Sequence, residues 1–247
     1  DMAENLKFST NSNFLTSGGY GPNQVSAVLG LGALLCWLLI FTQEKFSKMT
    51  WVSCFLFFWF LTQALLTFSR GGVLNFIVAG LFSTPYLIKK RPDIVNKLFI
   101  GAAIIAILIL LVLPKIDKFT QGAFEARYSD PDTTGRWELI QEDFALWQDN
   151  FLLGVGPGLS ANLHNKYAAA HTEYSRLVVE HGLFGAVAFL LLLLMGGTAF
   201  LRAPSALAKG LTLAYIVWSM TAMGHMAMRL AAISYFFGLS FAEFEDH

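Results

Sequence analysis

The sequence predicts an all-α fold, a polytopic membrane helical bundle of about seven spans with one large helical loop facing outward. Hydrophobic residues make up 55% of the 247 residues and charged residues only 14%, whereas ordinary soluble domains carry about 25% charged residues. The apolar residues also gather in runs of about 20 residues, the length that crosses a hydrocarbon core as a helix. Since only helices and closed barrels satisfy every backbone polar group in lipid, we expect a bundle of helices.

Four of the spans are expected in the first half of the chain. A polar segment, residues 1–23, ends in a turn-rich stretch of glycines and a proline and lacks the pattern of a cleavable signal peptide. The membrane bundle of residues 24–113 follows. Its apolar runs lie at 24–41, 50–69, 71–88 and 98–113.

Arg70 separates the second run from the third. The two runs together are too long for a single span, and an arginine at mid-bilayer would cost about 2.5–3.5 kcal/mol. We therefore expect a helical hairpin whose tight turn, Ser69-Arg70-Gly71-Gly72, holds the guanidinium at a membrane interface.

Three more spans are expected in the C-terminal membrane region, residues 183–247. Their apolar runs lie at 183–201, 210–224 and 230–242, and the last two are short. The basic links between spans set the orientation. The links at 43–49, 89–97 and 202–209 hold eight lysines and arginines. Seven spans put all three links on one side, which the positive-inside rule makes cytoplasmic, so the Arg70 turn and the polar loop of residues 114–182 face outward.

The polar loop, residues 114–182, carries the candidate chemistry. Four of its apolar residues recur at helical spacing: Trp137, Ile140, Phe144 and Trp147. We therefore expect an amphipathic helix that begins at Arg136 and lies along the membrane interface. The N-terminus of a helix favours an anion, and a guanidinium binds phosphate. Arg136 is thus a candidate diphosphate-binding residue, and an ion pair with Asp132 or Glu138 is the alternative interpretation.

A second helix of the loop is expected over residues 170–182, opened by His171. Histidine side chains exchange protons near neutral pH, so His171 and Glu173 are both candidate general bases for an acceptor hydroxyl. Arg176 lies four residues before Glu180. An i,i+4 ion pair is therefore the alternative interpretation of the charged residues in this helix.

Other features of the loop carry weaker signals. The glycine-rich residues 154–158 neither follow a strand nor carry the lysine of a P-loop, so we interpret them as a turn. Residues 130–132 (Asp-Pro-Asp) match the loose Asp-x-Asp pattern of metal-dependent sugar-nucleotide transferases, but those substrates are cytoplasmic and this loop faces outward. His164 and His181 have no companion in the sequence and are interpreted as polar loop residues. We expect no metal and no cofactor.

Composition also limits the class of partner and of function. The formal net charge is zero, whereas nucleic-acid binders show basic patches, so no nucleic acid is expected. Cys36 and Cys54 lie inside apolar runs, where we expect them to pack or to face lipid. A transporter is the alternative function, but it calls for charged or broken helices at mid-membrane. Here the mid-span polar residues, such as Gln63 and Asn75, are few and uncharged.

Four motifs follow one another around the loop: SRGG at 69–72, TGRWEL at 134–139, GVGPG at 154–158 and AHTEYSRLVVEHGLFG at 170–185. Together they resemble the O-antigen ligase and polymerase family of bacterial envelope membrane proteins. Members of that family usually carry several further N-terminal spans. The resemblance therefore also predicts that this chain is a C-terminal fragment of a longer protein.

The resemblance implies a chemistry. Family members resemble GT-C glycosyltransferases and transfer a preassembled glycan, with inversion, from an undecaprenyl-diphosphate carrier to an acceptor hydroxyl, without nucleotide or metal. Matched by motif, the family's essential arginines fall on Arg70 and Arg136 and its essential histidine on His171. Two guanidiniums would neutralise the diphosphate leaving group, and the histidine would orient or deprotonate the acceptor hydroxyl. Further substrate-binding candidates in the same motif are Glu173, Arg176, Tyr174 and Glu180.

The resemblance leaves the acceptor open. The first prediction is an O-antigen ligase-like transfer to a lipid A–core acceptor. The alternatives are an O-antigen or exopolysaccharide polymerase, which extends the glycan, and a protein glycan ligase. The implied partners are the undecaprenyl-diphosphate-linked glycan, the glycan or lipid A–core acceptor and membrane lipid. The implied location is the bacterial inner membrane, with the active site facing the periplasm.

Overall fold

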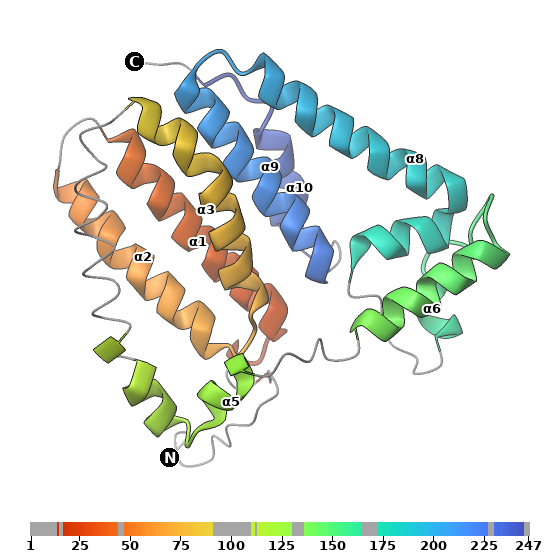
Figure 1. Cartoon of the computed structure of the whole chain (residues 1–247), viewed down its shortest axis with the longest axis horizontal. Helices are drawn as coiled ribbons and strands as arrows, with labels where there is room; N and C mark the ends of the chain where they lie inside the picture. Colours follow the sequence, from red (N-terminus) through yellow and green to blue (C-terminus); the bar gives the residue numbers. More distant parts are fainter. Residues whose placement is uncertain are drawn as a thin grey trace. The chain divides into compact units, whose positions relative to one another are not determined.

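The described part of the chain consists of helices and connecting turns (Figure 1). The structure is a computed structural model that describes residues 14, 17–43, 47–90, 110–111, 113–129, 136–164, 172–226 and 230–244. Within these ranges no residue belongs to a strand, which confirms the predicted all-α class. The chain divides into two compact units, Asp1–Pro131 and Asp132–His247. The division falls inside the polar loop.

Three long helices form the core of the first unit: α1 (Pro22–Thr42), α2 (Lys48–Leu66) and α3 (Gly71–Lys90). Helix α1 packs along both α2 and α3 (Figure 1). An aromatic cluster joins the three helices. The ring of Trp37 lies 5.8 Å from that of Phe57 and 6.2 Å from that of Phe76, and the last two rings are 5.2 Å apart. Such edge-to-face and tilted pairs add to the burial of apolar area.

Helices α1 and α3 approach so closely that two positions require glycine. A Cβ atom at Gly72 would lie 1.8 Å from the carbonyl oxygen of Ser26, and one at Gly30 would lie 2.1 Å from that of Gly72. The Ser26 hydroxyl accepts a hydrogen bond from the Gly72 N–H (3.2 Å) and donates one to the Ser69 carbonyl (2.9 Å). These contacts fix the start of α3 to α1.

We expect Gly72→Ala to destabilise the first unit by at least about 1–3 kcal/mol, the usual cost of overpacking. The added methyl group would overlap a backbone carbonyl, which cannot rotate away as a side chain does. The measurement is the thermal unfolding midpoint of the detergent-solubilised protein. Gly80→Ala in the same helix is the matched control, because its Cβ would meet no atom closer than 3.9 Å. Equal midpoints for the two variants would contradict the close approach.

The second unit contains a helix of the polar loop, α6 (Arg136–Asp149), the short α7 (Ser160–Leu163), the long α8 (Glu173–Arg202), α9 (Ala206–Met226) and the short α10 (Ala231–Leu239). Helix α8 bends at Gly182, whose φ of 58° and ψ of −133° are not helical. Helix α9 packs against α8 and α10. Its fully buried Trp218 contacts Phe236 of α10 in an edge-to-face pair at 5.8 Å.

Five helices within the described ranges are long and apolar enough to cross a membrane: α1, α2, α3, α8 and α9. They match five of the predicted spans. The predicted span at 98–113 lies almost entirely outside the described residues. The predicted span at 230–242 is wrong as a full crossing, because α10 has nine residues. Nine residues extend about 14 Å, less than half of a hydrocarbon core of about 30 Å.

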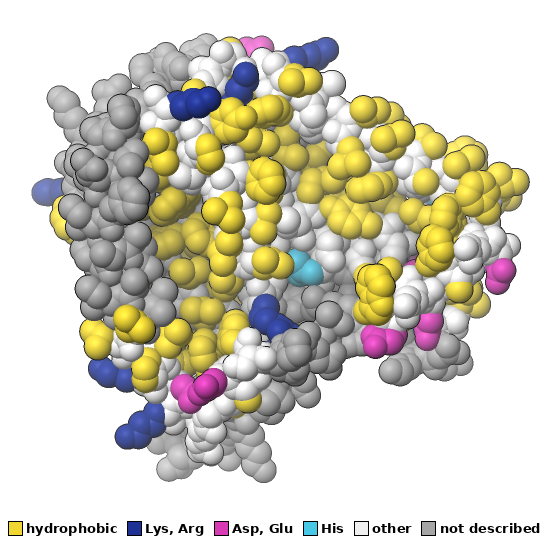
Figure 2. Space-filling model, in the orientation of Figure 1, with side chains coloured by type: hydrophobic (Ala, Val, Ile, Leu, Met, Phe, Trp, Pro, Cys, Tyr) yellow, Lys and Arg dark blue, Asp and Glu magenta, His cyan; other side chains and the backbone are white. Residues whose placement is uncertain are grey.

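Apolar side chains cover the outside of the long helices. Along α8 beyond the bend, Phe184, Leu190 and Leu194 are exposed, and Figure 2 shows hydrophobic side chains gathered over this helix. Soluble proteins rarely expose such continuous apolar surface. The surface is therefore that of an integral membrane protein.

Candidate functional site

Arg70 lies in the tight turn between α2 and α3, where the sequence predicted it. Phe68 takes a left-handed conformation with φ of 57°, which reverses the chain. The Thr67 hydroxyl donates to the Ala64 carbonyl (2.7 Å) and accepts from the Ser69 N–H (3.2 Å). The Ser69 hydroxyl donates to the Asn23 side-chain oxygen at 2.8 Å. The turn is thus fixed to both α2 and α1.

The same turn is covered by α5 (Ala123–Ser129), from the first part of the polar loop. The Nε of Arg127 donates to the Phe68 carbonyl and the Tyr128 hydroxyl donates to the Leu65 carbonyl, both at 3.1 Å. The centroid of the Phe124 ring lies 6.2 Å from that of the Phe68 ring and 4.6 Å from that of the Tyr128 ring. Sequence reasoning missed these contacts, which join residues 59 and 63 positions apart.

Burial raises the pKa of Tyr128 to about 12, although the guanidiniums of Arg127 and Arg70 act in the opposite direction. Tyr128 is therefore a neutral hydrogen-bond donor at every physiological pH.

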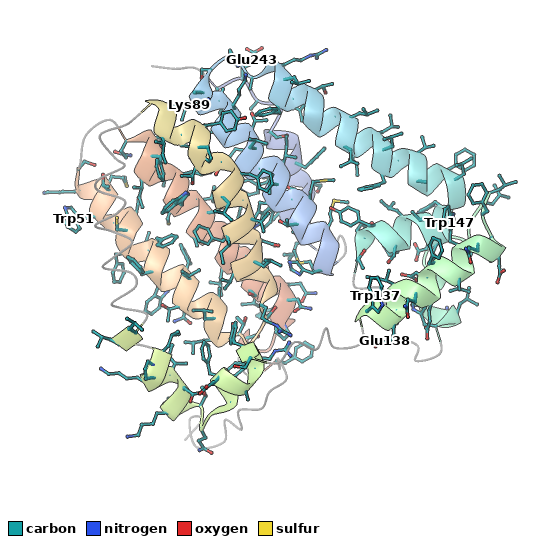
Figure 3. All side chains as sticks on the ribbon, in the orientation of Figure 1. Trp51, Lys89, Trp137, Glu138, Trp147 and Glu243 are labelled. Atoms are coloured by element: carbon teal, nitrogen blue, oxygen red, sulfur yellow. The ribbon has the colours of Figure 1, made fainter. Side chains whose placement is uncertain are left out.

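Arg136 is the first residue of α6, as predicted, and its side chain lies outside what the structure describes. The apolar side of α6 is exposed, with Trp137 and Phe144 60% and 54% accessible, whereas Asp143 is only 2% accessible. Trp137, Glu138 and Trp147 project from this helix in Figure 3. Helix α6 packs against α8, and its polar residues Glu138 and Gln141 are exposed as well. That it lies along a membrane interface stays a prediction.

Asp143 forms a buried pair with His164. The Nε2 atom of His164 lies 2.7 Å from Oδ1 of Asp143, and His164 is only 3% accessible. The interpretation of His164 as a polar loop residue is therefore wrong. The partners are 21 residues apart, so no local spacing in the sequence marks them.

We expect His164→Ala to destabilise the second unit by about 1–3 kcal/mol or more, because Asp143 would lose its buried imidazole partner. The loss would appear as a lower thermal unfolding midpoint. The double variant His164→Leu with Asp143→Leu should recover much of it, since it removes both polar groups from the interior. A double variant that is less stable than His164→Ala would contradict this account of the pair.

The charged residues at the start of α8 form a single cluster. Arg176 contacts Glu173 through Nε at 2.9 Å and Glu180 through Nη1 at 3.0 Å. Ser160 of α7 donates to the second oxygen of Glu180 at 2.8 Å. Both glutamates are buried. The predicted ion pair of Arg176 with Glu180 is thus confirmed, the pair with Glu173 is an addition to it, and a role for these residues at a substrate stays a prediction.

Tyr174 and His171 lie on either side of the helix start. The Tyr174 hydroxyl donates to the Met220 carbonyl of α9, and its ring lies 4.8 Å from that of Phe189. Tyr174 therefore ties the first turn of α8 to α9. His171 lies outside the described residues, directly before Thr172, whose hydroxyl caps the helix by accepting from the Ser175 N–H at 3.3 Å. Helix α8 begins at Glu173, three residues later than predicted.

The glycine-rich residues 154–158 form a turn that packs on the bend of α8. The N–H groups of Val155 and Gly156 donate to the carbonyls of Val179 and Glu180, at 2.8 and 3.1 Å. In return the Leu183 N–H donates to the Leu152 carbonyl at 3.2 Å. These amides serve the protein's own backbone, which confirms the interpretation as a turn.

A metal site receives no support from the part of the chain that the structure describes. Within it, no three His, Cys, Asp or Glu residues come close enough to hold an ion. The Asp-Pro-Asp stretch at 130–132 lies outside the described residues.

Comparison with known proteins identifies the family. No curated protein matches the chain. The family model described as O-antigen ligase, however, matches residues 55–190, more than half of the chain. The matched region includes Arg70, Arg136 and His171. The chain therefore belongs to the O-antigen ligase family, whose members are ligases and polymerases of lipid-linked glycans.

Proposed function

We propose that this protein transfers a preassembled glycan from an undecaprenyl-diphosphate carrier to an acceptor hydroxyl, most simply that of lipid A–core, as an O-antigen ligase. The observation that carries the proposal is the family match over residues 55–190. The matched region contains three candidate residues. Arg70 lies in the turn between two membrane-spanning helices, Arg136 begins α6, and His171 comes just before α8 in the sequence.

In the proposed reaction the acceptor oxygen attacks the anomeric carbon of the first sugar while the bond from that carbon to the diphosphate oxygen breaks. His171 accepts the proton of the acceptor hydroxyl. The electron pair of the broken bond stays on the undecaprenyl diphosphate, whose negative charge grows in the transition state. Arg70 and Arg136 stabilise that charge through charge-assisted hydrogen bonds. Attack from the side opposite the leaving group inverts the anomeric carbon.

The position of the arginines suits a lipid-bound substrate. The Arg70 turn and Lys89 lie at opposite ends of α3 (Figure 3). If the basic end is cytoplasmic, as the positive-inside rule favours, the Arg70 turn lies at the periplasmic face of the bacterial inner membrane. A diphosphate anchored to a polyprenyl chain is held at the membrane surface, at the same depth as the Arg70 turn. Two guanidiniums also supply the charge that a divalent metal provides in other transferases, so the proposed mechanism is metal-independent.

The experiment is glycan profiling of a strain in which the gene is deleted and then restored. We expect the deletion to remove all glycan-capped lipid and the restored gene to return the ladder. Caps of a single repeat unit would instead favour the polymerase alternative. An unchanged ladder would overturn the proposed function and would revive the transporter alternative, for which uptake of a labelled substrate into vesicles is the measurement.

A further inference from the structure

We propose that α5 holds the Arg70 turn in its active geometry, with Arg127 and Tyr128 as positioning residues for Arg70. The inference rests on the proposed function of Arg70. It assigns a role to the first part of the polar loop, which no motif singled out.

Helix α5 docks at the C-terminal end of α2. Its two consecutive residues donate to the carbonyls of Phe68 and Leu65, each at 3.1 Å. These carbonyls lie at and just after the C-terminal end of α2, where carbonyl groups lack the partner they have in the helix interior. The Leu65 carbonyl also accepts from the Phe68 N–H at 3.1 Å. The C-terminal end of a helix carries a partial negative charge that favours a cation. A guanidinium and a phenol at this end are therefore a stabilising cap.

The turn between α2 and α3 contains a strained backbone conformation at Phe68. Phe68 has a positive φ, which costs roughly 1–3 kcal/mol for a residue with a side chain, so its surroundings must hold it there. Arg127 holds its carbonyl, and Phe124 packs on its ring at 6.2 Å. Arg70 follows two residues later, so the contacts that fix Phe68 also fix the backbone from which the Arg70 side chain extends.

Arg127 is a buried charged residue. It is only 6% accessible, so it is buried in the first unit and is not a surface cation. Its charge and that of Arg70 both act on the Tyr128 phenol. Both guanidiniums therefore belong to the surroundings of this phenol. Loosening of α5 would disturb the position of Arg70.

The test uses purified full-length protein and undecaprenyl diphosphate without sugar as the binding probe. Tyr128→Phe removes only the hydroxyl and keeps the ring against Phe124, whereas Arg127→Met removes the guanidinium and keeps a long side chain. We expect each to raise the Kd for the probe and to lower kcat by about 10- to 100-fold, the scale of a misplaced catalytic group. The fraction of molecules that bind should stay at the wild-type value. Arg127→Lys, which keeps the charge, should recover part of the loss.

Controls separate this inference from the proposed function. Tyr86→Phe, at the other end of α3, is the matched control and should leave both quantities unchanged. A wild-type Kd and rate in Arg70→Ala would overturn the proposed function itself. A large effect of Arg70→Ala with wild-type values in Tyr128→Phe and Arg127→Met would overturn only the positioning role. So would a lower binding fraction at unchanged Kd, because that is the result of a purely structural role.

Discussion

Replacement of Arg136 or His171 by alanine is expected to lower glycan transfer by about 100-fold or more while the protein stays folded in the membrane. Loss of one group that stabilises transition-state charge costs about 10²–10³ in rate, and loss of a general base about 10²–10⁴. The measurement is transfer from undecaprenyl-diphosphate-linked glycan by purified protein, together with the glycan ladder of the complemented deletion strain.

The matched control for Arg136 is Gln141→Ala, a change at an exposed position of the same helix, which should leave the rate unchanged. Arg136→Lys should fall between wild type and alanine, because a lysine keeps the charge but loses the two-pronged geometry. An unchanged ladder and rate in both Arg136→Ala and His171→Ala would contradict the proposed function.

Gly182→Ala is expected to cost more than about 3 kcal/mol of folding free energy, enough to remove most folded protein from the membrane fraction. The backbone of Gly182, with φ of 58° and ψ of −133°, lies outside the regions that residues with a side chain normally adopt. A Cβ atom there would also lie 2.6 Å from the Leu152 carbonyl oxygen and 2.6 Å from the Gly154 nitrogen. Strain and overlap with backbone atoms therefore add together.

The control is Gly197→Ala in the same helix, where a Cβ atom would meet nothing within 4 Å. Because alanine favours helix over glycine by about 1 kcal/mol, this variant should be as stable as wild type or more stable. A Gly182→Ala protein with the unfolding midpoint of Gly197→Ala would show that the bend of α8 does not depend on glycine.

The membrane helices and the Arg70 turn could be predicted because their signals are local. A run of about 20 apolar residues has few alternatives to a span, and an arginine between two such runs marks an interface. The residues at 230–242 mislead for the same reason. Part of this apolar stretch packs on α9, where Phe236 contacts Tyr215 and Trp218, and hydropathy does not distinguish packing against a helix from contact with lipid.

The contacts that hold the candidate site residues in place could not be predicted, because they join residues far apart in the chain. Asp143 and His164 come from separate segments of the loop, and Arg127 reaches Phe68 across 59 residues. The ion pair of Arg176 with Glu180, by contrast, could be predicted because the two residues lie four positions apart on one helix. The second pair, with Glu173, was not predicted.

The central claim is that Arg70 and Arg136 act on one diphosphate, and a double-mutant cycle tests it most directly. Transfer is measured as kcat/KM for wild type, Arg70→Gln, Arg136→Gln and the double variant. Residues that act as a unit have strongly non-additive effects, so we predict that the second substitution costs much less than the first. Losses that simply multiply, or a wild-type rate in either single variant, would contradict a shared diphosphate.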